Sequence, residues 1–371
     1  MGLSQILYAK DTTLKEKIGQ MLIIGFKGSE LKPDNFIVKT LLAQQVGAVV
    51  LFDYDAESKT YDHNIKNPQQ LKKLTQDLQR YAKQAAEERN NDLYPLLIGI
   101  DYEGGKVNRL KERYGFPKTL SAAEIAALPY DDVKRYAEQM ADTLKQAGIN
   151  LNFAPVIDVN VNPDSPVIGK IGRSFSADPE KVVDYASIFS EVYQANNIVC
   201  TYKHFPGHGS ANGDTHMGFV DVTDTWKEYE LDPYTKLLSQ PFGCPVVMMA
   251  HVVNMRLDRQ GYPASISFAM TQELLREKLG FNGVVVTDDL QMRAITDNYG
   301  LAESLRLAIN AGADMLMFAY QSEFPEKDPL PQQIIDLIYA DIQNGKIKES
   351  RIEEAYQRIM TLKKDQRFSH T

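Results

Sequence analysis

Short apolar segments alternate with longer amphipathic segments along nearly the whole chain. The apolar segments lack the in-and-out alternation of a half-exposed strand, and they are typical of parallel strands that are covered on both faces. They begin near Met21, Val46, Leu96, Leu151, Ile198, Pro245, Gly283 and Ala313. The pattern therefore predicts eight buried strands.

The stretches between these strands have the residue spacing of surface helices. Asp178 followed by Pro179 is typical of an N-cap and a first helical residue, and Ser121 and Ser350 each begin a Ser-x-x-Glu capping box. The predicted helices cover residues 35–45, 67–89, 131–148, 178–197, 230–240, 267–280, 301–312 and 329–345. The polar segment 53–66 predicts an excursion after the second strand.

Eight strand–helix units with no linker rich in Pro, Ser or Gly favour an α/β fold, a single (β/α)8 barrel of the TIM type. A doubly wound open sheet is the alternative. We expect one domain over residues 1–371, with the barrel at about 19–345 and an additional C-terminal helix at about 348–366.

Composition narrows the class of protein. The 371 residues are 43% hydrophobic and 24% charged, which excludes a disordered or coiled-coil chain. No apolar stretch is long enough to predict a membrane span. The net charge of -8 argues against nucleic acid and anionic lipid as partners, and we expect a monomer.

The two cysteines, Cys200 and Cys244, lie beside apolar segments. Two cysteines in a chain of this length do not predict a disulfide framework, so they favour a reducing compartment. The first residues show no basic segment followed by an apolar one, which is how a signal peptide begins. We therefore expect a cytoplasmic protein, with a periplasmic or exported one as the alternative if a leader has been removed.

Polar and ionisable residues follow directly after five of the apolar segments. In a barrel, these positions meet at the carboxyl ends of the strands, where active sites lie. The residues are Asp101 and Glu103, then Asp158, then Lys203 to Gly209, then His251, and finally Thr287 to Asp289. Their predicted location on one rim points to an active site more strongly than any single residue does.

Segment 203–218 is the most specific of these. It contains three of the six histidines and four glycines, and this predicts a mobile loop at about 205–220. Asp214 and His216 are two residues apart, so the carboxylate can accept a hydrogen bond from the imidazole. Such a bond orients the ring and raises its basicity, which suits acid–base catalysis near neutral pH.

Together, these motifs resemble glycoside hydrolase family 3, in its NagZ-like β-N-acetylglucosaminidase (β-hexosaminidase) branch. The matching residues span about 20–320 in the family's order. They are Asp101 to Arg109, Pro155 to Asp158, Arg173 to Phe175, Lys203 to Gly209 with Asp214 to His216, Met249 to Val252, Pro263 to Ser267, and Val286 to Met292. The chain departs from the usual pattern at Tyr102, Lys106, Thr215 and Thr287 and before Arg173, which leaves the sugar-rim geometry and the leaving-group specificity open.

The resemblance implies a role for each matching residue. Asp288 would be the nucleophile that forms a covalent glycosyl intermediate, and Asp289 a supporting neighbour. His216, held by Asp214, would be the acid/base. The residues implied in sugar binding are Asp101, Arg109, Arg173, Lys203 and His204. A fixed carboxylate is well suited to stabilise and then trap a cationic, oxocarbenium-like transition state.

The implied activity is removal of terminal, non-reducing β-linked N-acetylglucosamine from peptidoglycan fragments during cell-wall recycling. A phosphorylase, a β-glucosidase, a non-catalytic sugar-binding protein and a metallohydrolase stay open as alternatives. We expect no organic cofactor. We also expect no metal, because the first strand does not end in His-x-His and Lys203 would repel a cation.

Overall fold

The protein is described here from a computed structural model. The structure describes residues 12–44, 46–61, 63–89, 91–321 and 331–365. The first residues, on which the prediction about a signal peptide rests, lie outside these ranges. So do the predicted helix start at 329 and the predicted helix end at 366.

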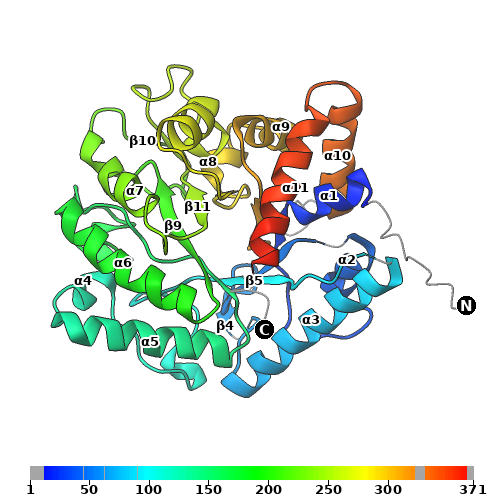
Figure 1. Ribbon diagram of the computed structural model, residues 1–371, viewed down its shortest axis with the longest axis horizontal. Coiled ribbons are helices and arrows are strands. Elements are labelled where there is room, and N and C mark those ends of the chain that lie inside the picture. The colour runs from blue at the N-terminus through cyan, green and yellow to red at the C-terminus, as the bar shows by residue number, and fades with distance from the viewer. Residues whose placement is uncertain (1–11, 45, 62, 90, 322–330, 366–371) are drawn as a thin grey trace, which may run out of the picture.

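Eight parallel strands form one sheet that closes into a barrel with helices around it (Figure 1). The sheet order runs from β13 through β11, β9, β8, β5, β2 and β1 to β14, and a parallel bridge between Val286 and Met315 joins its two edges. The strands are β1 (Leu22–Ile24), β2 (Ala48–Leu51), β5 (Leu97–Ile100), β8 (Leu151–Asn152), β9 (Val199–Phe205), β11 (Val246–Met249), β13 (Val284–Thr287) and β14 (Leu316–Phe318). The predicted (β/α)8 barrel and all eight predicted strands are confirmed.

Helices cover the outside of the barrel, most of them where amphipathic segments were predicted (Figure 1). They are α2 (Phe36–Gln44), α3 (Pro68–Arg89), α4 (Ala122–Ile125), α5 (Tyr130–Gln146), α6 (Pro179–Ala195), α7 (Asp232–Leu237), α8 (Arg293–Thr296), α9 (Leu301–Ala311) and α10 (Pro331–Gln343). Two predicted helices differ in detail. The one at 230–240 is a 3-10 turn, Glu228–Leu231, that leads into α7, and the one at 267–280 is a π-helix, Ala269–Lys278.

The predicted helix starts are right in two cases and wrong in one. Asp178 accepts a hydrogen bond from the Glu180 backbone, with Pro179 as the first helical residue, and Ser121 forms its capping box. The C-terminal helix α11 (Glu349–Lys364) already begins before Ser350, and its N-cap residue makes no side-chain bond. The predicted cap at Ser350 is therefore wrong, because that residue lies inside the first turn.

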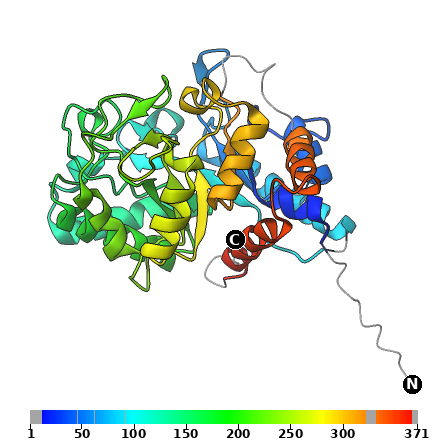
Figure 2. The same ribbon diagram turned by 90° about the horizontal axis from the view of Figure 1, so that it is seen from above.

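Three α-helices of the described chain lie outside the predicted ranges: α4, α8 and one near the N-terminal end. Helix α1 (Leu14–Gln20) begins with a capping box formed by Thr13 and Glu16. It packs against α10 and α11, and ion pairs join Lys17 to Glu353 and Lys15 to the side chain of Asp336. These helices lie side by side in both views, so the two ends of the described chain come together (Figure 2).

Three small pairs of strands lie beyond the carboxyl ends of the barrel strands. The predicted excursion after the second strand contains an antiparallel hairpin, β3 (Tyr54–Asp55) and β4 (Thr60–Tyr61). A second hairpin pairs β6 (Tyr102–Gly104) with β7 (Val107–Asn108), and β10 (Val220–Asp221) runs parallel to β12 (Val252–Val253). The last two pairs lie next to the candidate site residues in sequence.

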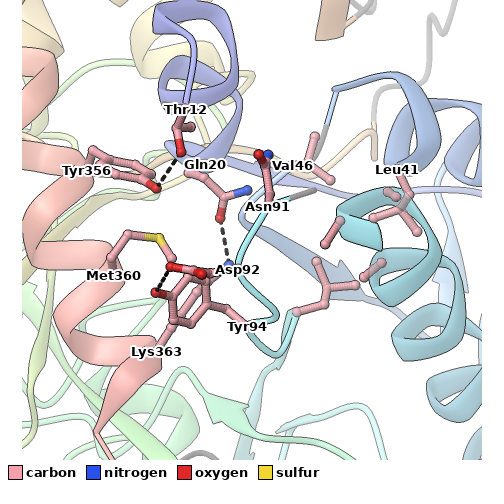
Figure 3. Close-up of a pocket in the computed structure, with 14 residues that line it drawn as sticks. Thr12, Gln20, Leu41, Val46, Asn91, Asp92, Tyr94, Tyr356, Met360 and Lys363 are labelled. Atoms are coloured by element: carbon pink, nitrogen blue, oxygen red, sulfur yellow. Dashed lines mark hydrogen bonds between the residues drawn. The ribbon is translucent and has the colours of Figure 1, made fainter. Parts of the chain in front are cut away.

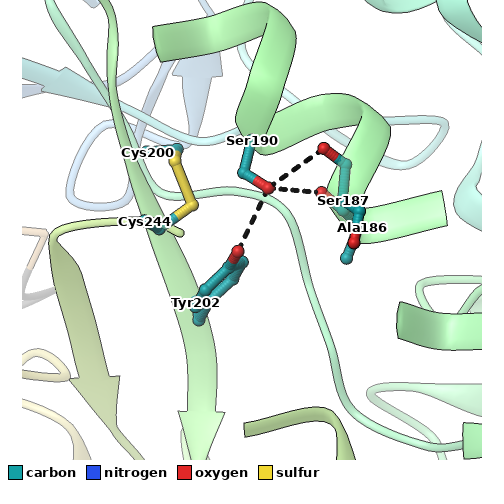
Figure 4. The surroundings of a disulfide bond; sticks show 6 residues. All are labelled: Ala186, Ser187, Ser190, Cys200, Tyr202 and Cys244. Atoms are coloured by element: carbon teal, nitrogen blue, oxygen red, sulfur yellow. Dashed lines mark hydrogen bonds between the residues drawn. A yellow bond between two sulfur atoms is a disulfide. The ribbon is translucent and has the colours of Figure 1, made fainter. Parts of the chain in front are cut away.

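The sequence predicted no disulfide framework, but the two cysteines are paired. Cys200 and Cys244 form a disulfide bond with their Cα atoms 5.0 Å apart (Figure 4). Cys200 is the second residue of β9, and Cys244 lies just before β11, the neighbouring strand in the barrel. The pairing depends on this adjacency of two strands, which a count of cysteines does not reveal.

No helix in the described part of the chain combines the length and the apolar character that crossing a membrane requires.

Candidate active site

A cluster of charged side chains, half-buried except for the buried Lys203, lies at the carboxyl ends of β5 and β9. Asp101, directly after β5, accepts hydrogen bonds from Arg109 at 3.0 Å and from Lys203 at 2.9 Å. Burial alone would raise the pKa of Asp101, but the positive charges of Lys203 and Arg109 lower it instead. Asp101 is therefore a carboxylate across the physiological pH range, and its charge holds both cations in place.

Arg173 and Glu103 form the second half of this cluster. Two guanidinium nitrogens of Arg173 donate to the two carboxylate oxygens of Glu103, at 2.7 and 2.8 Å. Lys203 Nζ lies 2.7 Å from Glu103 as well, so it connects the two carboxylates. Burial opposes the charge on Lys203, but Asp101 and Glu103 outweigh it and raise its pKa. The cluster is a rigid, charged surface of the kind that binds hydroxyl groups.

His204 is held by a buried carboxylate. Its Nδ1 lies 2.7 Å from Asp158, which also accepts the backbone N–H groups of His204 and His208. The other ring nitrogen, Nε2, lies 3.3 Å from a guanidinium nitrogen of Arg173. Because a guanidinium can only donate, Nε2 must accept, and the ring proton therefore sits on Nδ1 and is donated to Asp158.

The loop that follows β9 carries the predicted acid/base pair. His216 Nδ1 lies 2.7 Å from Asp214, and the His216 backbone N–H donates to the same carboxylate oxygen. This hydrogen bond is the main cause that raises the pKa of the imidazole, and the negative charge of Asp288 raises it further. The His216 side chain is 69% exposed, so its outer nitrogen can reach a ligand or water.

Asp288 lies directly after β13, with its backbone N–H bonded to Met249 in the neighbouring strand β11. Burial would raise the pKa of its carboxyl, but His251, His204 and His216 lower it. Asp288 and His216 thus act electrostatically on each other. A backbone hydrogen bond from Ala294 to Thr215 also ties the loop of His216 to the segment that follows Asp288.

The neighbouring Asp289 has the opposite electrostatic behaviour. Burial is the largest cause that raises its pKa to about 7, and the charge of Asp288 adds to it, although backbone N–H groups of Gln291 and Ala319 oppose the shift. At neutral pH Asp289 is therefore only about half ionised, whereas Asp288 is fully ionised. The negative charge is concentrated on the residue predicted to be the nucleophile.

The two remaining rim histidines are buried, but only the His251 ring makes hydrogen bonds in the described chain. His251 Nε2 donates to the carbonyl of Asp289 at 2.8 Å, and Nδ1 lies 2.7 Å from Ser265. Burial lowers the pKa of His208 to about 4. The His208 ring is therefore neutral at physiological pH, and neither histidine was among the predicted site residues.

Glycines let the chain turn tightly between the two histidine–aspartate pairs. A Cβ atom on Gly209 would lie 1.7 Å from the carbonyl oxygen of Val159, and Gly207 has φ +120° against the side chain of Glu230. The side chains of residues 205–211 are buried. The predicted loop at 205–220 thus begins with a tightly packed turn, and its exposed part starts only at Asn212.

The structure brings all eight predicted site residues to this rim. Two residues that hold them, Glu103 and Asp158, were seen at strand ends but were given no role. The available signal was a balance of charge: Arg173 and Lys203 at a buried rim require carboxylate partners. In the part of the chain that the structure describes, no group of three His, Cys, Asp or Glu side chains is placed to hold a metal ion.

Comparison with known proteins identifies the family. The model of the glycosyl hydrolase family 3 N-terminal domain matches residues 13–362. The chain belongs to glycosyl hydrolase family 3. The resemblance inferred from its motifs is therefore confirmed.

Two similar proteins of this family are both named as β-hexosaminidases. A Beta-hexosaminidase of Idiomarina loihiensis is 34% identical over 80% of this chain and 82% of its own length. Beta-hexosaminidase A of Pseudoalteromonas piscicida is 28% identical over 95% of this chain, which corresponds to 61% of that protein. The family 3 chain thus spans less than two thirds of that relative.

Solved structures agree in fold. A glycoside hydrolase family 3 β-N-acetylglucosaminidase of Paenibacillus superposes with a TM-score of 0.81 and 33% identity, over 96% of this chain and 63% of that one. A β-N-acetylhexosaminidase of Beutenbergia cavernae superposes with a TM-score of 0.79 and 26% identity, over 96% of this chain and 99% of that one. Both place the family 3 chain among the (β/α)8 barrels.

Proposed function

We propose that this family 3 glycoside hydrolase is a retaining exo-β-N-acetylglucosaminidase, with Asp288 as nucleophile and His216 as acid/base. The observation that carries the proposal is their placement: Asp288 follows β13, and a backbone hydrogen bond from Ala294 to Thr215 ties the loop of His216 to the segment after Asp288. Asp288 and His216 each shift the pKa of the other toward its charged form. A carboxylate and an imidazolium on opposite sides of a sugar ring are the groups that a two-step displacement requires.

In the first step, the imidazolium of His216 donates its proton to the glycosidic oxygen while Asp288 attacks the anomeric carbon. The leaving group departs as an alcohol, and a glycosyl ester of Asp288 remains. In the second step, the neutral imidazole takes a proton from water, which attacks the same carbon and releases the sugar. Asp214 holds the ring in one orientation through both steps.

The charged cluster at the rim would bind the terminal sugar. Asp101, Arg109, Arg173, Lys203 and His204 offer donors and acceptors whose positions are already fixed by their mutual bonds. The preference for the N-acetyl sugar is supported by the names of the similar proteins. The peptidoglycan fragment as natural substrate, and a role in cell-wall recycling, rest on the family resemblance of the motifs.

We also propose that residues 1–371 form one domain that acts as a monomer without metal or organic cofactor. Of the two compartments considered from the sequence, the disulfide between Cys200 and Cys244 supports the exported location over the cytoplasmic one. Size-exclusion chromatography and cell fractionation test these statements separately.

The decisive experiment traps the intermediate. The protein is incubated with a slow fluorinated N-acetylglucosamine analogue and digested, and mass spectrometry locates the label. We expect a single sugar on Asp288, no label in Asp288→Asn, and normal labelling in the matched control Asp289→Asn, whose amide oxygen can still accept the Gln291 and Ala319 N–H groups. A label on any other residue would refute the assignment.

The same preparation distinguishes the phosphorylase alternative. Product release is compared in buffers with and without phosphate, using an aryl N-acetylglucosaminide. We expect free N-acetylglucosamine at equal rates in both. A sugar phosphate as the main product would replace the hydrolase by a phosphorylase.

A further inference from the structure

A cavity lies at the amino-terminal end of the barrel, opposite the rim that carries the candidate active site. It measures about 80 Å³ within a hollow of about 680 Å³ that opens to solvent. Helices α1, α3 and α11 and the segment before β5 surround it (Figure 3). Nothing in the glycosidase chemistry uses this cavity.

Lys363, in the last turn of α11, lines the cavity and is 3% exposed. Its Nζ donates to Gln20 Oε1 and to the carbonyl oxygen of Gly47, both at 2.8 Å. In the described part of the chain these are its partners. A neutral amine has two N–H groups, and both are then bonded, which leaves its lone pair free. An ammonium ion would have a third N–H group without an acceptor.

No described carboxylate lies within 4 Å of Lys363 Nζ. The titratable groups that line the cavity are Asp92, Tyr94 and Tyr356, and Asp92 accepts a hydrogen bond from Tyr94 at 3.0 Å. Burial therefore acts alone on Lys363 and lowers its pKa to about 7. Lys203 is equally buried, but its two carboxylate partners raise its pKa.

We propose that Lys363 is an acylation site, at which a neutral amine reacts with small activated acyl groups, such as acyl phosphates, that enter the cavity from solvent. A buried lysine without a counter-ion, next to a cavity, is the arrangement that makes an amine nucleophilic. The proposal is independent of the glycosidase activity.

The reaction balances with an acyl phosphate as the only co-reactant. The Nζ lone pair attacks the carbonyl carbon, and a C–N bond forms. The C–O bond to phosphate breaks, and phosphate leaves with the electron pair. One amine proton passes to water, and the product is a neutral amide.

The amide keeps one N–H group, so one of the two acceptors, Gln20 or Gly47, loses its hydrogen bond. These acceptors belong to α1 and to the residue before β2, and Lys363 belongs to α11. Acylation would therefore weaken the attachment of the C-terminal helix to the barrel. We expect the acylated protein to unfold at a lower temperature than the unmodified protein.

The test exposes the intact protein to acetyl phosphate between pH 6 and 9 and measures acetylation at each lysine by mass spectrometry. Exposed Lys83 and buried, ion-paired Lys203 are internal controls. We expect the rate at Lys363 to level off above pH about 7.5. At an ordinary lysine it rises about tenfold per pH unit in this range. A rate at Lys363 no higher than at Lys203, or one rising as steeply as at Lys83, would overturn the proposal.

A conservative variant tests whether the reactivity of Lys363 depends on the lack of a carboxylate partner. Gln20→Glu places a carboxylate where the amide oxygen accepts the Lys363 hydrogen bond, with nearly the same shape. The new charge should keep the amine protonated and slow acetylation of Lys363 at pH 8 at least tenfold, while Lys83 is unaffected. Unchanged acetylation of Lys363 in a folded Gln20→Glu protein would contradict the proposal.

Discussion

Two histidine–aspartate pairs have nearly identical hydrogen bonds, and their histidines come from β9 and from the loop that follows it. In each pair the ring Nδ1 lies 2.7 Å from a carboxylate oxygen. Their surroundings differ greatly. The side chains of His204 and Asp158 are 6% and 0% exposed, whereas those of His216 and Asp214 are 69% and 33% exposed.

The outer ring nitrogen determines what each pair can do. In His204 it faces the guanidinium of Arg173, so the ring has a fixed tautomer and both nitrogens are bound. In His216 the outer nitrogen has no hydrogen-bond partner in the described chain, and it is therefore available for proton transfer. The same bond thus supports recognition where it is buried and acid–base catalysis where it is exposed.

The strongest test of this contrast is removal of the His216 imidazole. We expect His216→Ala to lower kcat about 10³-fold for a substrate with a poor leaving group, because proton donation contributes 10²–10⁴-fold. For an aryl glycoside with an acidic phenol, the loss in the first step should be small. Steady-state kinetics with a series of phenols measures this, and equal losses across the series would contradict the role of His216 as acid.

The buried pair should respond differently. We expect Asp158→Asn to lower kcat/KM by about 10²-fold for all leaving groups, since it removes the acceptor that orients His204 for binding. The expected change is mainly in KM. A loss that depends on the leaving-group pKa, as for His216, would mean that the two pairs are not distinct. Circular dichroism spectra provide the folding control.

The pH profile sharpens the comparison further. The acid must be protonated, and the pKa of His216 is raised, so activity should persist above the ordinary histidine pKa of about 6.5 and fall at higher pH. Asp214→Asn removes the main cause of the shift and should move the alkaline limb of kcat to lower pH. Asp158→Asn is the matched control and should leave that limb in place.

The smallest effect on activity is expected at the other end of β9. Cys200→Ser with Cys244→Ser removes the disulfide far from the rim, so kcat should stay within about twofold. The free energy of unfolding should fall by about 2–4 kcal/mol, because the cross-link limits the unfolded chain. Urea unfolding of both forms measures it. A large loss of kcat would show that the disulfide at the amino end of β9 affects the arrangement of the catalytic residues at the rim.

The sequence predicts most of this architecture because its signals are local. Buried strands are continuous apolar segments, and Asp178 and Ser121 are recognisable from their neighbours. Helix α1 could also have been predicted, since Thr13 and Glu16 have the capping-box spacing. It was missed because it is short and lies outside the strand–helix repeat.

Contacts between residues that are far apart in the sequence were harder to predict. The disulfide depends on which strands are neighbours, and the partners of Arg173 and Lys203 depend on how the ends of β5 and β9 converge. The motif matches identified Asp288, His216 and Asp214, but the shift of Asp289 to a pKa of about 7 follows from burial beside Asp288. Such shifts require coordinates.

The close approach of Gly209 to Val159 also limits how the enzyme can be engineered. Asn162 donates its backbone N–H to the Gly209 carbonyl and its side-chain amide to Ala211, which fixes the base of the loop. A library that aims at new aglycone preferences should leave 207–211 unchanged and vary 217–219, where Met217 and Phe219 are exposed. Changes in specificity would then be confined to a segment of a few residues beside a turn that packing holds in place.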